Sequence, residues 1–165
     1  MPPITALLHT RNDALRLGRA LEMLLPCAEI LIVDHLSADA TPRIARAYGA
    51  GVVTAAGDTS PNHYLNLARH DWILCLKSGE SITEGLQASL FEWSALPTGV
   101  GVSPVAGGSP FSVVVREQTG ERWLVLPTPE TRLIPRRWNL WQGWLPAHEP
   151  SANVLQGELL RFDLP

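Results

Sequence analysis

The chain has 165 residues, a hydrophobic fraction of 45% and a formal net charge of -3 at pH 7. This length suits one domain with a substantial buried core, and the mildly acidic balance gives no reason to expect nucleic acid or an anionic membrane as a partner. No apolar run reaches the roughly 18 residues of a transmembrane helix, and the N-terminus lacks the pattern of a signal peptide. Two cysteines are too few for a disulfide framework or a zinc site, so we expect a cytoplasmic protein.

The first part of the sequence alternates short apolar runs with amphipathic segments. Strands are expected at residues 5–8, 29–34, 51–55 and 72–76. Helices are expected between and after them, at 14–25, from about 40 to 49, within 58–70 and from about 82 to 96. This alternation predicts an α/β fold with a mostly parallel sheet, flanked by helices and joined by right-handed crossovers.

Polar residues mark the expected starts of these helices. Asp13 is placed to cap the first helix, and Ser37 or Asp39 to cap the second. Ser81 and Glu84 have the spacing of a capping box before the last helix.

Beyond Gly99 the expected elements are strands, so the C-terminal third adds β ribbons to the α/β part. These strands are expected at 100–105, 111–116, 122–126 and 131–134. Thr119-Gly120 supplies a hairpin turn between two of them. We therefore expect one domain over residues 1–165, with one half at 1–98 and a shorter, β-rich half at 99–165.

Three of the six tryptophans are spaced by three residues near the C-terminus. At that spacing Trp138, Trp141 and Trp144 would lie along one face of a helix. Such a face serves as part of the core, as a platform for stacking sugars, or as an interface for a partner protein or a second copy of the chain.

Polar and glycine-containing motifs recur near the ends of the expected elements. They are, in chain order, His9-Thr10-Arg11-Asn12-Asp13, Ile32-Val33-Asp34-His35-Leu36-Ser37-Ala38-Asp39-Ala40-Thr41, Tyr48-Gly49-Ala50-Gly51-Val52-Val53, Asp71-Trp72-Ile73-Leu74-Cys75-Leu76-Lys77-Ser78-Gly79-Glu80, Arg132-Leu133-Ile134-Pro135-Arg136-Arg137 and His148-Glu149. In order and spacing this series resembles the small bacterial members of the family 2 glycosyltransferases, which use nucleotide-sugar donors on a GT-A fold. The resemblance implies a GT-A-like, Rossmann-like sheet whose first half, residues 1–98, binds the nucleotide, while 99–165 forms the acceptor side.

The resemblance assigns the nucleotide to residues that follow strand ends, where ligands of open α/β sheets bind. By resemblance, the Asp34 carboxylate accepts the imide N–H of uracil, and Thr10, Arg11 and Asn12 line the base and the ribose. For Ser37 and Asp39 two roles stay open, because either residue is also suited to capping a helix.

The chain departs from the family where the family carries Asp-x-Asp, the carboxylates that hold the ribose and a divalent metal. Lys77-Ser78-Gly79 stands there, and Glu80 alone remains of the acidic run. One carboxylate with His148 makes a poor Mg²⁺ or Mn²⁺ site, so we expect no tightly bound metal. Either Lys77, with donors from Ser78 and Gly79, replaces the metal on the diphosphate, or catalysis is weak or lost.

An inverting sugar transfer also needs a general base near the acceptor hydroxyl. The resemblance favours Glu149, with Glu80 behind it. The alternative for Glu149 is an ion pair with Arg132, Arg136 or Arg137.

The sequence thus predicts a glycosyltransferase-like protein that binds a nucleotide sugar, UDP type favoured, as substrate rather than as a tightly bound cofactor. Its acceptor would be an unidentified glycan or lipid, and the transfer metal-independent, weak or lost. The alternative is a non-catalytic interaction module that keeps the fold and docks a partner through the tryptophan-rich C-terminal third.

Overall fold

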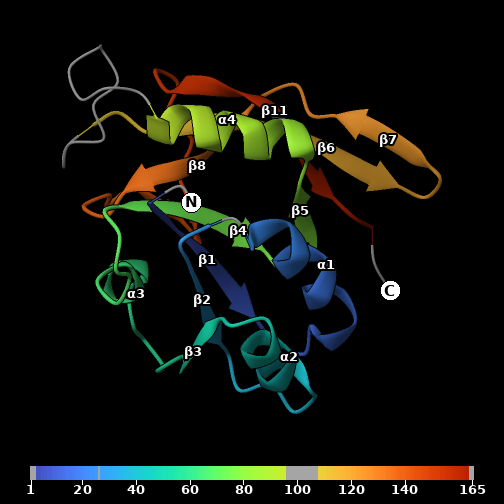
Figure 1. Cartoon of the computed structure of the whole chain (residues 1–165), viewed down its shortest axis with the longest axis vertical. Helices are drawn as coiled ribbons and strands as arrows, with labels where there is room; N and C mark the ends of the chain where they lie inside the picture. Colours follow the sequence, from blue (N-terminus) through green and yellow to red (C-terminus); the bar gives the residue numbers. More distant parts are fainter. Residues whose placement is uncertain (1–2, 26, 96–107, 164–165) are drawn as a thin grey trace.

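The computed structural model describes residues 3–25, 27–95 and 108–163, so the strand expected at 100–105 lies outside the described residues. Its helices are α1 (Ala14–Leu24), α2 (Thr41–Ala47), α3 (Pro61–Leu65) and α4 (Glu84–Ala95) (Figure 1). Its strands are β1 (Ile4–Thr10), β2 (Glu29–Asp34), β3 (Gly51–Thr54), β4 (Trp72–Lys77), β5 (Glu80–Ile82), β6 (Phe111–Thr119), β7 (Arg122–Val125), β8 (Glu130–Pro135), β9 (Trp141–Gln142), β10 (Leu145–Pro146) and β11 (Asn153–Arg161).

One large sheet forms the centre of the molecule, in the order β3-β2-β1-β4-β8-β6-β11-β5, with β7 paired to β6. The first four strands are parallel, as the alternating sequence predicts. β8 runs antiparallel to both β4 and β6, while β11 is parallel to β6 and antiparallel to β5. The α/β fold is confirmed, and the complete sheet is mixed because the C-terminal strands enter it in both directions.

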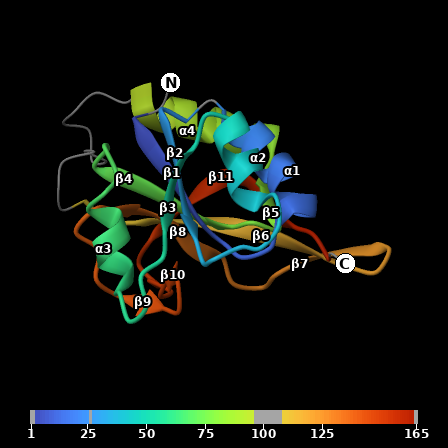
Figure 2. The ribbon, with the colours of Figure 1, turned by 90° about the horizontal axis from the view of Figure 1, so that it is seen from below.

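Both faces of the sheet are covered, which explains why its parallel strands are continuously apolar. On one face, buried side chains of α1, α2 and α4 pack on the sheet. On the other face, α3 and the segment around β9 and β10 pack through Tyr64, Trp138, Trp141 and Leu145. Figure 2 shows these two layers on opposite sides of the sheet. The parallel strands therefore run between two cores, and their carboxyl ends reach one edge of the sandwich.

The helix starts differ from the expected caps. Asp13 is at the N-cap of α1, but its carboxylate accepts from the Arg11 N–H at 2.8 Å and pairs with Arg16 at 2.7 Å, not with a helical N–H. The N-cap of α4 is Thr83, whose hydroxyl accepts from the Leu86 N–H. The capping box expected at Ser81 is therefore wrong, because Ser81 lies inside β5.

Asp39 joins the starts of two helices. Its carboxylate accepts from the Thr41 N–H at 2.9 Å and from the Ala14 N–H at 3.2 Å, while the N-cap position of α2 itself falls on Ala40. Ser37 does not cap α2, because its hydroxyl bonds to Asp34 and to the backbone of Asn12.

The helical face expected for the three tryptophans is wrong. Trp138 lies in a turn, Trp141 in β9, and Trp144 between β9 and β10. The indole N–H of Trp141 donates to the Asn62 side chain at 2.8 Å, and the Trp138 N–H to the Leu140 carbonyl. A hairpin, rather than a helix, gives the three rings separate surroundings.

The last strand, β11, had no counterpart among the expected elements. Gly157 interrupts its alternation, and the pairing with β6 shifts register between Val154 and Glu158. Gly157 has φ +96°, and a Cβ there would lie 2.2 Å from the Leu86 nitrogen. Only glycine lets β11 pass this close to the start of α4.

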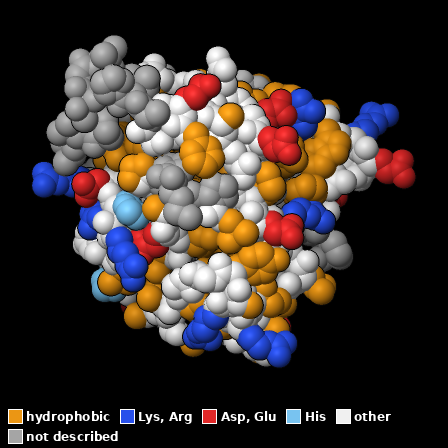
Figure 3. All heavy atoms as spheres, in the orientation of Figure 1, with side chains coloured by type: hydrophobic (Ala, Val, Ile, Leu, Met, Phe, Trp, Pro, Cys, Tyr) orange, Lys and Arg blue, Asp and Glu red, His pale blue; other side chains and the backbone are white. Residues whose placement is uncertain are grey.

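The surface offers no extended region of one charge on the side shown in Figure 3, where acidic and basic side chains of the described residues are interspersed. Among the described helices, none has both the length and the apolar character needed to span a membrane.

Candidate functional site

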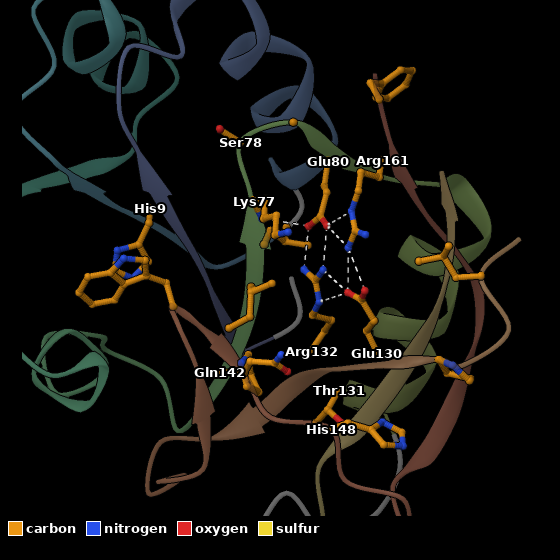
Figure 4. A pocket seen from close by; sticks show the side chains of 18 of the residues that line it. His9, Lys77, Ser78, Glu80, Glu130, Thr131, Arg132, Gln142, His148 and Arg161 are labelled. Atoms are coloured by element: carbon orange, nitrogen blue, oxygen red, sulfur yellow. Dashed lines mark hydrogen bonds and ion pairs between the residues drawn. The ribbon is translucent and has the colours of Figure 1, made fainter. Parts of the chain in front are cut away.

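A cavity of about 900 Å³ opens at the carboxyl ends of β1 and β4. Its wall continues along β8 and the end of β11, and the β9–β10 hairpin closes one side (Figure 4). Cavities of this size hold small organic ligands. The position is the one at which open α/β sheets bind ligands, beyond the carboxyl ends of parallel strands.

The turn between β4 and β5 contributes Lys77, Ser78 and Gly79 to this cavity, together with Glu80 at the start of β5. The Lys77 side chain is exposed and makes no ion pair among the described residues. Its backbone N–H donates to the Glu80 carboxylate at 2.9 Å. The turn thus presents one unpaired ammonium group to the cavity.

Glu80 is the centre of a buried ion-pair cluster. Its two oxygens accept from Nη1 and Nη2 of Arg132, each at 2.7 Å, and Oε1 also accepts from Arg161. Glu80 and Arg132 are each only 1% exposed. Glu130 pairs with both arginines, and Glu117 with Arg161 at 3.0 Å. Figure 4 shows Glu80, Glu130, Arg132 and Arg161 pointing toward one another.

The cluster fixes the ionisation of its carboxylates. Burial alone would raise the pKa of Glu80, but the charge and hydrogen bonds of Arg132 hold it below its usual range. The pKa of Glu130 is likewise lowered, by Arg132 and Arg161 against the effect of burial. The three carboxylates and two guanidinium groups of the cluster together carry one net negative charge.

Divalent metal does not fit the place where the resemblance would put it. The described residues hold no group of three or more metal-ligating side chains. The position offers an ammonium, a hydroxyl and a backbone N–H, and the one carboxylate, Glu80, already accepts from two arginines. Hard cations require free oxygen ligands, and this donor set suits an anion better.

The residues expected around the nucleobase form a separate hydrogen-bonded loop structure. The Asp34 carboxylate accepts from the Thr10 hydroxyl at 2.9 Å and from the hydroxyl and N–H of Ser37 at 2.6 and 2.9 Å. Asn12 donates its N–H to Ser37 and accepts from the Ala38 N–H. Asp34 is 5% exposed, and none of these residues lines the cavity. We call Thr10, Asn12, Asp34 and Ser37 the Asp34 cluster.

The Asp34 cluster holds a strained piece of backbone. Asn12 and Leu36 have φ of +52° and +57°, which side chains other than glycine seldom adopt. The reciprocal bonds between Asn12, Ser37 and Asp34 stabilise both turns. Arg11, also expected here, has an exposed side chain, and its N–H donates to Asp13.

Four aromatic rings lie at the ends of β1 and β2. His9 stacks on Trp144 with ring centres 4.4 Å apart, and its Nδ1 lies 2.8 Å from Nε2 of His35. Tyr64 contacts both His9 and Trp144 edge-on. Burial, and then the charge of His35, lower the pKa of His9 to about 3, so the His9 ring is neutral at physiological pH.

Glu149 lies beside the cavity rather than in its wall, which His148 lines instead. The Glu149 carboxylate accepts from the hydroxyl and N–H of Ser151, and these bonds lower its pKa. Two of its three expected arginine partners are paired elsewhere, since Arg132 pairs within the cluster and Arg136 with Asp71.

Several residues of the cavity were not expected from the sequence. Glu130 and Arg132 are two residues apart on β8 and therefore lie on the same face of the strand. This spacing could have identified them as a charged pair. Arg161 and Gln142 carry no such local signal, because the pairing of β11 and the β9–β10 hairpin bring them to the site. Trp144, expected on a helical face that could stack sugars or dock a partner, lines the cavity from the turn between β9 and β10 instead.

Comparison with known proteins places this geometry in a fold class. No protein-family model and no curated protein sequence matches the chain. Among solved structures, S. aureus TarS 1-349 superposes with a TM-score of 0.54 at 15% identity, over 76% of this chain and 38% of that one. TarS 1-349 has also been solved with UDP and with UDP-GlcNAc.

A second similar structure is glucosyl-3-phosphoglycerate synthase from Mycobacterium tuberculosis in complex with Mn²⁺, UDP-glucose and phosphoglyceric acid. Its TM-score is 0.50 at 18% identity, over 68% of this chain and 43% of that one. The chain therefore has the GT-A-like fold of these structures, as the sequence resemblance implies. It spans less than half of the length of either structure.

Proposed function

We propose that this chain binds a nucleotide-sugar donor of the UDP type in the cavity, with Lys77 holding the diphosphate. The observation that carries the proposal is the unpaired ammonium of Lys77 at the carboxyl end of β4, on the cavity wall. The likeness to TarS 1-349, which has been solved with UDP and with UDP-GlcNAc, supports a uridine nucleotide as ligand.

The chemistry of the turn suits a phosphate better than a metal. Lys77 supplies a compact positive charge, while the Ser78 hydroxyl and the Gly79 N–H are available as neutral donors. Arg132 and Arg161 do not compete for the diphosphate, because their charges are consumed by Glu80, Glu130 and Glu117. In this proposal the buried cluster positions the turn, and Glu80 is a positioning residue rather than a base.

Sugar transfer is the wider part of the proposal. An acceptor hydroxyl of a glycan or lipid would enter from the side of His148, where Glu149 is the nearest candidate base. Because the pKa of Glu149 is low, it is ionised and able to accept a proton, but only weakly basic. We therefore propose that any transfer is slow and metal-independent. The Asp34 cluster, with Arg11 and Asp39, shapes the nucleoside end through the loops that it orders.

The test uses the fact that Lys77 is the sole lysine among the 165 residues. Affinities for UDP, UDP-glucose and uridine are measured by calorimetry in EDTA and in Mn²⁺, for the wild type, Lys77→Ala and the charge-matched control Arg46→Ala on α2. Loss of a charge-assisted contact predicts about 10- to 100-fold weaker binding of UDP to Lys77→Ala. Uridine affinity and Arg46→Ala should be unaffected.

Amine acetylation read by mass spectrometry gives a second measurement. UDP should protect the Lys77 side chain from acetylation in EDTA while leaving the N-terminal amine reactive. If neither UDP nor UDP-glucose binds the wild type with or without Mn²⁺, the proposal is wrong. The non-catalytic interaction module then becomes the better account of the fold.

A further inference from the structure

Trp144 is an exposed aromatic ring that the structure holds in a fixed orientation. One face stacks on His9 at 4.4 Å with an angle of 22° between the rings. His35 and Tyr64 contact it from the sides, at 5.1 and 6.0 Å between ring centres. The residue nevertheless remains 38% exposed and lines the cavity. The three ring contacts hold the indole in place while part of it stays exposed at the cavity.

The position of this ring relative to Lys77 is set by the sheet. His9 on β1 is the register partner of Lys77 on β4, and neighbouring strands lie about 4.8 Å apart. Trp144 covers the ends of β1 and β2 through His9 and His35. The cavity therefore presents an aromatic surface over β1 and β2 and a cation at β4. On the β8 side the wall continues with His148 and with Thr131, whose hydroxyl already bonds to Ser112 and to the Glu149 N–H.

This order matches the order of groups in a nucleotide sugar, which has its diphosphate between an aromatic base and a polar sugar. With the diphosphate at Lys77, the base falls on the side of Trp144 and the sugar on the side of Thr131 and His148. The reverse orientation would put the sugar against the rings and leave the base among polar groups. Aromatic stacking favours the first orientation.

The Asp34 cluster makes a second contribution. The Asp34 carboxylate is buried, already accepts three hydrogen bonds and does not line the cavity. A carboxylate that is buried outside the cavity wall cannot reach the imide N–H of a base in the cavity unless the loop that holds it rearranges. Selecting the base through Asp34 would therefore disrupt the hydrogen bonds that order the loop.

We propose that Trp144 is the surface on which the nucleobase stacks, and that the site takes nucleoside diphosphates with little discrimination between bases. This inference rests on the proposed function, adds the residue that binds the base, and widens the ligand from the UDP type to nucleoside diphosphates in general. Every base has a π-face, so a site that stacks the base without forming hydrogen bonds to its edge binds different bases with similar affinity. Asp34 is then a positioning residue that orders the loop below the rings.

The experiment compares Trp144→Ala, Trp144→Phe and Trp123→Ala. Trp123 on β7 has the same 38% exposure and does not line the cavity, so Trp123→Ala is the matched control. Stacking predicts that Trp144→Ala weakens UDP, CDP, ADP and GDP by about 5- to 150-fold and by a similar factor for each. Trp144→Phe should recover most of the affinity, and Trp123→Ala should bind like the wild type.

Inorganic pyrophosphate separates this inference from the proposed function. It should protect Lys77 from acetylation equally in the wild type and in Trp144→Ala, because it has no base to stack. If UDP binds Trp144→Ala as tightly as the wild type, or if the wild type prefers UDP by more than 100-fold over the other three, the Trp144 inference is wrong while the proposed function stands. If neither UDP nor pyrophosphate protects Lys77, both are wrong.

Discussion

Glu80 and Arg132 face each other across the sheet as a bidentate pair, with both carboxylate oxygens 2.7 Å from separate guanidinium nitrogens. The pair joins β5 to β8, and a further bond from Arg132 Nη1 to the Cys75 carbonyl ties it to β4. Three strands that carry the cavity are thus fixed to one another by charge. Because this pair is buried, replacing only one of its two residues should lower the stability of the chain more than replacing both with apolar residues.

Replacing Arg132 alone should be strongly destabilising. Arg132→Met leaves the buried Glu80 with only the partly exposed Arg161 as counter-charge, and breaking one side of a buried pair costs about 3–5 kcal/mol. Arg69→Ala is the control, because Arg69 is 84% exposed in its pair with Glu29 and such pairs contribute about 0–1 kcal/mol. Urea denaturation at pH 7 measures both, and equal losses would contradict the structural role of the cluster.

The pH dependence of stability should report His9. Its pKa is lowered to about 3 in the folded chain and is about 6.5 when unfolded. Below pH 6.5 the unfolded histidine takes up a proton that folded His9 refuses. The contribution of His9 is therefore complete above pH 6.5 and is lost as the pH falls toward 3, with a slope of up to about 1.4 kcal/mol per pH unit.

His9→Asn should reduce that slope between pH 6.5 and 4.5, while the exposed control His63→Asn should retain it. Glu80 and Glu130 do not confuse the measurement, because their lowered pKa values place their contribution at lower pH, below the model-compound value of 4.5. Urea denaturation at half-unit pH steps gives the slopes. An unchanged slope in His9→Asn would show that His9 is not held neutral.

Removing the Asp34 carboxylate should lower stability more than nucleotide affinity. Asp34→Ala deprives Thr10 and Ser37 of their acceptor, and the buried Thr10 hydroxyl left without a partner costs about 1–3 kcal/mol. Asp58→Ala, at an exposed loop aspartate, is the control. Thermal denaturation and calorimetry with UDP are the two readouts. Lost affinity with unchanged stability would assign Asp34 to direct contact with the base instead.

Alanine at Gly157 should destabilise the chain more than alanine at Gly120. Both glycines have positive φ, but a Cβ at Gly120 meets nothing within 4 Å, so its cost is the backbone term of about 1–2 kcal/mol. At Gly157 the new methyl group also collides with Leu86, which adds about 1–3 kcal/mol of overpacking. Similar unfolding free energies for the two variants would mean that β11 has room to move away from α4.

The parallel half of the fold was predictable because its information is local. A run such as Ile30–Val33 needs two covered faces to be stable, and the amphipathic segments beside it supply one of them. The hairpin at Thr119-Gly120 was predictable for the same reason, since Gly120 adopts the positive φ that its turn requires. These signals depend on neighbours within a few residues.

The candidate site was only partly predictable, because its remaining members come together by long-range pairing. Lys77 followed from the position of an expected strand end. Arg161 reaches Glu80 because it lies on β11, a strand that was not expected since Gly157 interrupts its alternating pattern. Trp144 reaches His9 because a hairpin stands in place of the expected helix. The hydrogen bonds that the Asp34 carboxylate accepts could not be predicted either, since they depend on where Thr10 and Ser37 place their hydroxyl groups.

The position of β11 inside the sheet, between β6 and β5, has a consequence for synthesis of the chain. Arg161 bonds to Glu80 across 81 residues, so at about 5–20 residues per second the ribosome takes roughly 4–16 s to supply it. During that interval β1 to β4 have emerged and can pair, while β5 lacks the neighbour that it has in the finished sheet. The nascent chain thus leaves the edge of β5 unpaired until β11 is made, and a ribosome stalled before residue 153 should hold a chain recognised by chaperones.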